Sequence, residues 1–187
     1  MAKRSDAIKN EQLIMKTAQT LFNNNEVEKV SMKKIAETAQ IGTGTLYRHF
    51  SDKSEICHAL LEHHIEAMFE KIEQQKQRVS DQQEVLRFIF LTLIQLMEDH
   101  VDLLKEIERK DKQNRVMMQT PFYLKLKDEA VACITQLNIV SDPDFHADLL
   151  LNSFSADVFE YQHYVKKIPS EQFVDRVLKI FVRGVQS

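Results

Sequence analysis

The densest group of side chains suited to binding a ligand lies between residues 33 and 53, where hydroxyl, imidazole, phenol and cationic groups alternate with apolar ones. The apolar residues fall four apart, with Ile35 and Ala39 as one pair and Leu46 and Phe50 as the next. This spacing predicts two short amphipathic helices joined by a glycine-containing turn. The chain shows no nucleophile motif, carboxylate pair or phosphate-binding loop, so the pattern favours hydrogen bonding and charge contacts over catalysis.

Two short helices joined by a tight turn, with donors on the exposed side of the second, are typical of a helix-turn-helix that enters the major groove of DNA. Ser31 precedes the first helix as its capping residue. The segment also resembles the DNA-binding signature of the TetR family of bacterial regulators, a pattern close to I-A-x-x-A-G-V-S-x-G-T-L-Y-x-H-F-x-x-K. Ten positions match that pattern in register: Ile35, Ala36, Ala39, Gly44, Thr45, Leu46, Tyr47, His49, Phe50 and Lys53.

The resemblance implies which residues contact the bases, because in that family the polar face of the second helix enters the major groove. On the matching positions, Thr43, Thr45 and His49 would face DNA. Gly44 would allow the backbone to approach the duplex closely. Arg48 has two interpretations, since it could contact a guanine or remain a solvated cation.

The resemblance also implies the phosphate contacts. The Tyr47 hydroxyl and the Lys53 ammonium would hold phosphates within and after the recognition helix. Lys33 and Lys34 stand at the start of the preceding helix, where side chains and backbone N–H groups together suit an anion. The alternative for each residue is an exposed polar group on a short helix.

The chain departs from the family pattern at the turn of the motif. Gln40 stands where the family commonly has glycine, and a left-handed backbone there would cost about 1 kcal/mol of strain. Gly42 replaces the serine that often caps the recognition helix, and it is a weaker cap unless Thr43 serves one residue later. These departures concern the geometry of the turn and remove no DNA contact.

Composition and charge fit a two-part helical protein. Only three glycines and three prolines occur in 187 residues, which favours long helices over a sheet-rich fold. Residues 1–53 contain nine Lys and Arg against six Asp and Glu, whereas residues 54–187 contain sixteen against twenty-two. A basic N-terminal part on an acidic remainder suits a protein that touches phosphates at one end.

No targeting or membrane segment is expected. The N-terminus lacks an apolar stretch, and the most apolar window, 85–97, is too short and too polar to span a bilayer. The protein is therefore expected to be cytoplasmic, with Cys57 and Cys133 as thiols packed in helices. Its seven histidines show no ligand spacing with a third partner, so neither a metal site nor a cofactor is expected.

The periodicity predicts an all-α fold with two domains, a three-helix DNA-binding domain at 1–53 and an effector-binding and dimerisation domain at 54–187. The expected core of the first domain is Ile14, Ala18, Leu21, Phe22, Val30, Ile35, Ala39, Ile41, Leu46 and Phe50. The expected helices outside the motif are Asp6–Asn23, Asp52–Arg78, Asp81–His100, Val101–Lys112, Pro121–Leu137, Pro143–Lys167 and Ser170–Val185.

Apolar and methionine side chains in the middle of the second domain have two interpretations. They could form an ordinary helix-bundle core, or they could line an effector cavity, because members of the resembling family commonly bind a small molecule between body helices. The candidate ligand-binding residues are Phe88, Leu91, Ile94, Met97, Met117, Met118, Phe122 and Leu126.

The last two predicted helices form a hairpin with apolar stripes. The hairpin could simply close the body, but in the resembling family it pairs with its twofold mate in a four-helix interface, which suits a twofold DNA site. The candidate dimerisation residues are Phe154, Val158, Tyr161, Phe173, Val177, Ile180 and Phe181.

These features together predict a regulator and no enzyme. The leading hypothesis is a ligand-responsive transcriptional repressor of TetR type that binds a palindromic double-stranded operator as a homodimer and responds to a small, mostly apolar effector. The alternative is a DNA-binding protein of the same fold whose body binds a partner protein. An enclosed cavity with inward polar groups favours the first hypothesis, and a sealed body with an exposed apolar patch favours the second.

Overall fold

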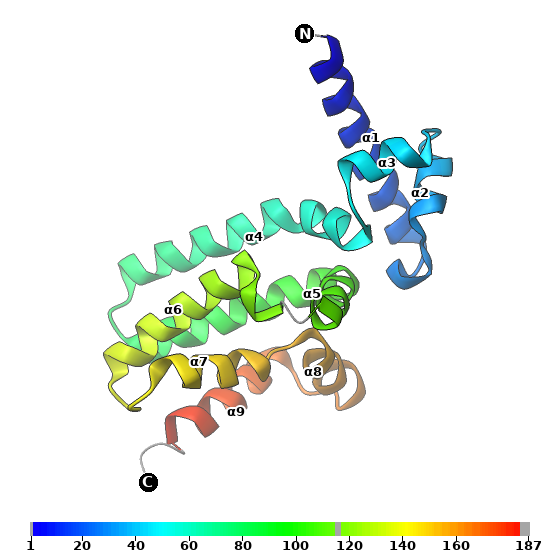
Figure 1. Cartoon of the computed structure of the whole chain (residues 1–187). Helices are drawn as coiled ribbons and strands as arrows, with labels where there is room; N and C mark the ends of the chain where they lie inside the picture. The colour runs from blue at the N-terminus through cyan, green and yellow to red at the C-terminus, as the bar shows by residue number, and fades with distance from the viewer. Residues whose placement is uncertain (1, 115–116, 184–187) are drawn as a thin grey trace. The chain divides into compact units, whose positions relative to one another are not determined.

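The computed structural model describes residues 2–114 and 117–183, and every regular element within those ranges is helical (Figure 1). This confirms the predicted all-α fold. No helix in the described part of the chain is both long and apolar enough to cross a membrane. The elements in order are α1 (Ala2–Asn24), η1 (Val27–Lys29), α2 (Met32–Thr38), α3 (Thr43–His49), α4 (Lys53–Arg78), α5 (Gln82–Asn114), η2 (Met117–Gln119), α6 (Pro121–Leu137), α7 (Pro143–Asn152), α8 (Ala156–Glu160), the π-helical turn η3 (Tyr161–Val165) and α9 (Ser170–Arg183).

The chain forms two compact units, and the first is built from two separate stretches of sequence. It comprises the residues up to His63 together with Asp102–Lys110, from the last part of α5. The second unit comprises His64–Val101 and the residues from Asp111 onward. The predicted domain division after residue 53 stays a prediction, while the compact first unit reaches into α4 and recruits a segment some forty residues further along.

The first unit has its own apolar core, to which α1, α2, α3 and the start of α4 contribute. Its buried members are Ile14, Ala18, Val30, Ile35, Ala36, Leu46, Phe50 and Ile56, and Leu21, Phe22 and Ile41 pack partly buried against them. Most of this core follows from the helical spacing of the sequence. Ala36 and Ile56 were missed, and Ile56 belongs to α4, beyond the three helices of the motif.

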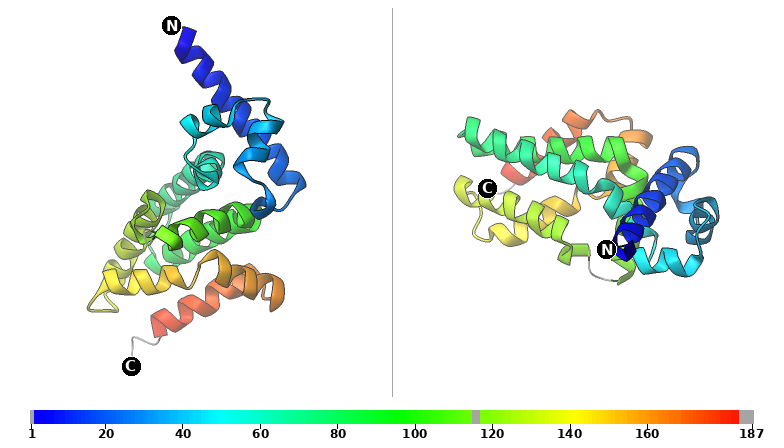
Figure 2. Two further views of the ribbon diagram at one scale, coloured as in Figure 1. Left: turned by 45° about the vertical axis from the view of Figure 1, so that its right-hand side comes forward. Right: turned by 90° about the horizontal axis from the view of Figure 1, so that it is seen from above.

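In the second unit, α6 has the bounds that the sequence predicts. Thr120 caps its start by accepting a hydrogen bond from the Tyr123 N–H at 3.2 Å, and Pro121 occupies the first turn. Asn138 ends the helix in the left-handed conformation, with φ of 50°. The adjacent α7 packs beside α6 in each view (Figure 1, Figure 2).

The structure confirms the predicted division between the helices Asp81–His100 and Val101–Lys112. Within α5, two helical stretches meet at a kink at His100, whose φ of −143° and ψ of 29° are non-helical. Neither glycine nor proline stands at this kink. The His100 ring lies 4.4 Å from the His64 ring, measured between centroids.

The predicted helix Pro143–Lys167 is wrong as one element, because the structure breaks it into α7, α8 and η3. Ser153 ends α7 and turns its hydroxyl back to the Leu149 carbonyl at 3.1 Å. Ser155 then caps α8 by accepting from the Val158 N–H. Serine side chains compete with the backbone ladder in this way, which explains the break.

Both cysteines are free thiols buried in helices, in agreement with the sequence analysis. Burial raises the pKa of Cys57 to about 12 and that of Cys133 to about 11. A thiol is a nucleophile only as thiolate, so these side chains act as small apolar groups at neutral pH.

Candidate nucleic-acid interface

The interface begins with α2, which the sequence caps as predicted. The Ser31 hydroxyl accepts a hydrogen bond from the Lys34 N–H at 3.1 Å. Ile35 is buried in the core of the first unit, which leaves Lys33 and Lys34 exposed on the first turn of α2. Both predicted phosphate contacts thus have cationic side chains that solvent can reach.

The turn between α2 and α3 has the strained geometry considered in the sequence analysis. Gln40 has a positive φ of 54°, the left-handed region that favours glycine. The Ile41 N–H donates to the Ala36 carbonyl at 3.1 Å, which ties the turn back to α2. Gly42 occupies the capping position of α3. Glycine has no side chain, so no side-chain capping bond forms there.

Gln40→Gly is expected to raise the free energy of unfolding by about 1 kcal/mol, because glycine adopts the left-handed region without a Cβ clash. Urea unfolding followed by circular dichroism measures the difference. Asn138→Gly is the matched control at a second left-handed position, and its gain should be smaller because asparagine tolerates that region. Equal or absent gains at both positions would contradict the strain at Gln40.

The recognition helix α3 divides cleanly between a buried stripe and an accessible face. Leu46 is fully buried, and Phe50 caps the helix C-terminus within the same core. Opposite them, Tyr47 is 52% exposed and Arg48 is exposed. Thr43 and Gly44 are also exposed, and Thr45 and His49 are half-buried. The structure thus brings the predicted base-contacting residues together on one short helix.

Two further details describe the chemistry that this face offers. One Arg48 guanidinium N–H donates to the Thr45 hydroxyl oxygen at 3.3 Å, which orients the cation along the helix. At Gly44, a Cβ would meet no atom within 4 Å apart from its chain neighbours and the backbone of its own helix. The space at Gly44 is therefore empty of the protein's own atoms, as close approach of a duplex backbone would require.

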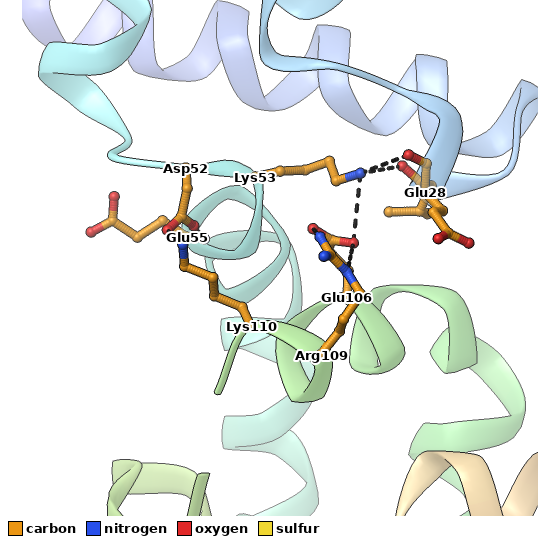
Figure 3. Close-up of polar contacts among 8 residues, drawn as sticks. Glu28, Asp52, Lys53, Glu55, Glu106, Arg109 and Lys110 are labelled. Carbon is orange, nitrogen blue, oxygen red and sulfur yellow. Dashed lines mark hydrogen bonds and ion pairs between the residues drawn. The ribbon is translucent and has the colours of Figure 1, made fainter. Parts of the chain in front are cut away.

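Lys53 behaves differently from the other predicted DNA contacts. Its Nζ donates to the backbone carbonyls of Val27 at 2.8 Å and Glu28 at 3.1 Å, and it pairs with the Glu106 carboxylate at 3.6 Å (Figure 3). An ammonium has three N–H donors, and these partners can use all of them. This geometry does not favour the phosphate contact that the resemblance assigned to Lys53.

The predicted ligand-binding residues all belong to the second unit, and several are core residues. Ile94, Met97 and Leu126 are buried, and Phe88, Leu91 and Phe122 are half-buried, with the Phe122 ring edge-on to Phe69 at 6.2 Å. Met118 is exposed, and the side chain of Met117 lies outside the described residues. Their role in ligand binding stays a prediction.

A groove in the second unit involves none of these residues. Its volume is about 420 Å³, and it lies where the start of α5 meets α9. Arg87 crosses it to Asp175, with Nε to Oδ1 at 2.6 Å. The lining residues are Asp81, Gln83, Glu84, Leu86, Arg87, Asp175, Leu178 and Lys179.

The predicted dimerisation residues separate into three groups by their burial. Phe154 and Phe173 are buried within their own chain, and their place in a surface toward a partner stays a prediction. Tyr161 and Ile180 are exposed, at 49% and 70%. Val158, Val177 and Phe181 are half-buried. An apolar stripe alone does not reveal which of its edges faces the chain's own core.

Sequence reasoning missed one residue that the structure places beside the interface. Glu106 is only 6% exposed and lies against Lys53, more than fifty residues away in sequence. A single glutamate on the charged last part of α5 carries no local signal of burial, and only the tertiary contact reveals it.

Comparison with known proteins identifies the same region. The family model of bacterial regulatory proteins, tetR family, matches residues 14–60, which include α2, α3 and the start of α4. A Staphylococcus aureus relative (strain bovine RF122 / ET3-1), the HTH-type transcriptional regulator SAB2452, is 34% identical over 187 residues. The match covers 98% of each chain.

Solved structures show the same fold at lower identity. Thermus thermophilus FadR, a TetR-family repressor in complex with lauroyl-CoA, superposes with a TM-score of 0.73 at 17% identity, over 93% of this chain and 94% of that one. Bacillus subtilis FadR in complex with stearoyl-CoA gives a TM-score of 0.62 at 18% identity, over 92% and 98%. Because the family model covers the helix-turn-helix and the Staphylococcus relative aligns from end to end, this chain belongs to the TetR family of bacterial DNA-binding transcription regulators.

Proposed function

We propose that the protein is a repressor that binds a near-palindromic operator as a homodimer and releases it when a small, mostly apolar effector binds. The observation that carries the proposal is the accessible polar face of α3, held in place by buried Leu46 and Phe50. Thr43, Thr45 and Arg48 on that face offer hydroxyl and guanidinium groups for base edges.

The proposal of a dimer is supported by the count of recognition helices and by the exposed apolar residues of the second unit. One chain supplies one recognition helix, whereas a twofold operator needs two, spaced about one helical turn, ~34–36 Å. Tyr161 and Ile180 are exposed apolar side chains on η3 and α9. A twofold contact would cover such residues in both copies at once.

The proposal of an apolar effector is supported by the ligands of the two structural neighbours. Both FadR proteins were solved with fatty acyl-CoA thioesters, whose acyl chains are apolar. In this chain Phe88, Leu91 and Met97 occupy α5 of the second unit, and flexible methionine can reshape around such a chain.

Ile180→Glu is expected to weaken both self-association and operator affinity by about tenfold, because a charge at an apolar contact must be desolvated. Sedimentation velocity and fluorescence anisotropy with a duplex selected by the wild-type protein measure the two quantities. Lys179→Asn is the matched control, since it also changes the charge of an exposed α9 residue but removes no apolar surface. A monomer that still binds the duplex tightly would contradict the dimer proposal.

One observation favours the alternative in which the body binds a partner protein. Phe145 and Leu149 stand one turn apart on α7 and are both exposed. A thermal-shift screen with saturated and unsaturated acyl-CoA compounds distinguishes the two proposals when each hit is added to the operator complex. Hits that stabilise the protein and release DNA support the effector proposal, while hits that never alter DNA affinity favour the partner protein.

A further inference from the structure

A cluster of charged side chains inside the first unit joins the start of α4 to the last part of α5 (Figure 3). At its centre the buried Glu106 carboxylate accepts from Arg109 at 2.8 and 3.3 Å and pairs with Lys53 at 3.6 Å. A carboxylate removed from water requires such partners. We call this group the α4–α5 charge cluster; its residues are Asp52, Lys53, Glu106, Arg109 and Lys110.

A second contact of the cluster lies on the residue that caps α4. The Asp52 carboxylate accepts from the Glu55 N–H at 3.1 Å and also pairs with the Lys110 ammonium at 3.4 Å. Residues 102–110 of α5 are therefore attached to the first turn of α4 at two points. Both contacts lie within one compact unit.

Lys53 also holds the segment that leads into the helix-turn-helix. Its carbonyl partners, Val27 and Glu28, belong to η1, which runs directly into the cap of α2 at Ser31. Phe50, at the C-terminus of α3, precedes Lys53 by only three residues. One ammonium thus joins the chain where it enters the helix-turn-helix to the chain where it leaves.

From this geometry we propose that Lys53 and Glu106 form a positioning pair for DNA binding, in which Glu106 holds the Lys53 ammonium inward so that Lys53 sets the placement of α2 and α3 and contacts no phosphate. The inference rests on the proposed operator binding. It makes Glu106, in the last part of α5, a determinant of operator affinity although its buried carboxylate has no access to DNA.

The salt dependence of binding separates a positioning role from a phosphate contact. Each phosphate neutralised by a lysine contributes about 0.9 to the slope of log K against log salt concentration. Loss of a positioning residue lowers specific affinity and leaves that slope unchanged. It also leaves binding to an unrelated duplex intact, because non-specific affinity depends on phosphate contacts.

The test compares Lys53→Met, Glu106→Gln and the double variant with Lys34→Met, a control at an exposed lysine on α2. Affinity is measured by anisotropy against potassium chloride for a duplex selected from a random library by the wild-type protein, and for an unrelated duplex. We expect Lys53→Met and Glu106→Gln each to lower the affinity for the selected duplex about tenfold and to leave the salt slope unchanged. The double variant should lose no more affinity than the single variant that binds less tightly. Lys34→Met should reduce the slope by about 0.9 for each phosphate that the lysine no longer neutralises.

Two results would overturn the positioning pair. One is a slope for Lys53→Met that falls as it does for Lys34→Met; the other is a Glu106→Gln variant that binds like the wild type. If Lys53→Met does not fold, Glu106→Gln alone decides, because the amide keeps the shape of the side chain and one acceptor oxygen.

A second measurement keeps this inference separate from the proposed function. If the wild-type protein prefers no duplex in the library, operator binding itself fails, and a double-mutant cycle in urea unfolding then tests the pair without DNA. Coupling of about threefold or more in the unfolding equilibrium constant supports the pair. Additive effects of the two substitutions overturn it.

Discussion

Gly44→Ala is expected to weaken operator binding by about a hundredfold while the protein stays folded. Beyond its chain neighbours and the backbone of its own helix, the added Cβ meets no atom within 4 Å, so the fold accepts it. In the complex, however, it would stand between the second residue of α3 and the duplex. A penalty of about 1.4 kcal/mol at each of two recognition helices multiplies to that hundredfold change.

Anisotropy titration of the selected duplex measures the loss of affinity, and thermal unfolding of the same sample provides the internal control. Alanine is a better helix former than glycine, so the free energy of unfolding should stay the same or rise by up to about 1 kcal/mol. The midpoint temperature of unfolding should therefore not fall. Gly44→Ser, with one more atom, should bind at least as weakly. Full operator affinity in Gly44→Ala would exclude Gly44 from the DNA contact.

Phe154→Ala is expected to lower the free energy of unfolding by about 3–5 kcal/mol, the range for truncating a fully buried phenylalanine. The Phe154 ring is only 1% exposed and is stacked on Phe90 at 4.3 Å. It also lies 5.2 Å from the Phe173 ring of α9, so its loss opens a cavity between α5 and α9. This core spans α5, the α7–α8 connection and α9.

Urea unfolding at several protein concentrations distinguishes this core role from a role at a dimer surface. A residue buried within one chain lowers stability by the same amount at every concentration. The effect of an interface residue grows with protein concentration, because only the associated form contains that contact. Tyr161→Ala is the matched control, since Tyr161 is an exposed aromatic residue on the same hairpin. A loss of stability in Phe154→Ala that depends strongly on protein concentration would instead assign Phe154 to a dimer interface.

The sequence predicted the elements whose ends are set by local chemistry. Ser31 and Thr120 are side-chain caps, and Pro121 and Asn138 occupy positions that begin and end a helix through their own backbone preferences. Each signal acts within a few residues, so it can be read without knowledge of the fold. The α2–α3 motif and α6 were predictable for this reason.

The features that the sequence did not predict depend on contacts between distant segments. The inward direction of Lys53 depends on Glu106 and on two backbone carbonyls of η1, none of which is a neighbour in sequence. Phe154 and Ile180 both belong to apolar stripes, yet packing buries one and exposes the other. Periodicity identifies a stripe, but only tertiary structure decides what covers it.

The two-segment construction of the first unit has a consequence for building hybrid regulators. Joining the N-terminal sixty residues of this chain to the body of another regulator would leave Lys53 without Glu106, and the donor body would bring its own residues against the start of α4. A transferable module therefore has to include residues 102–110 as a second graft. Chimeras that receive both segments should keep the operator preference of this protein. Chimeras that receive the first segment alone should bind the same operator with lower affinity.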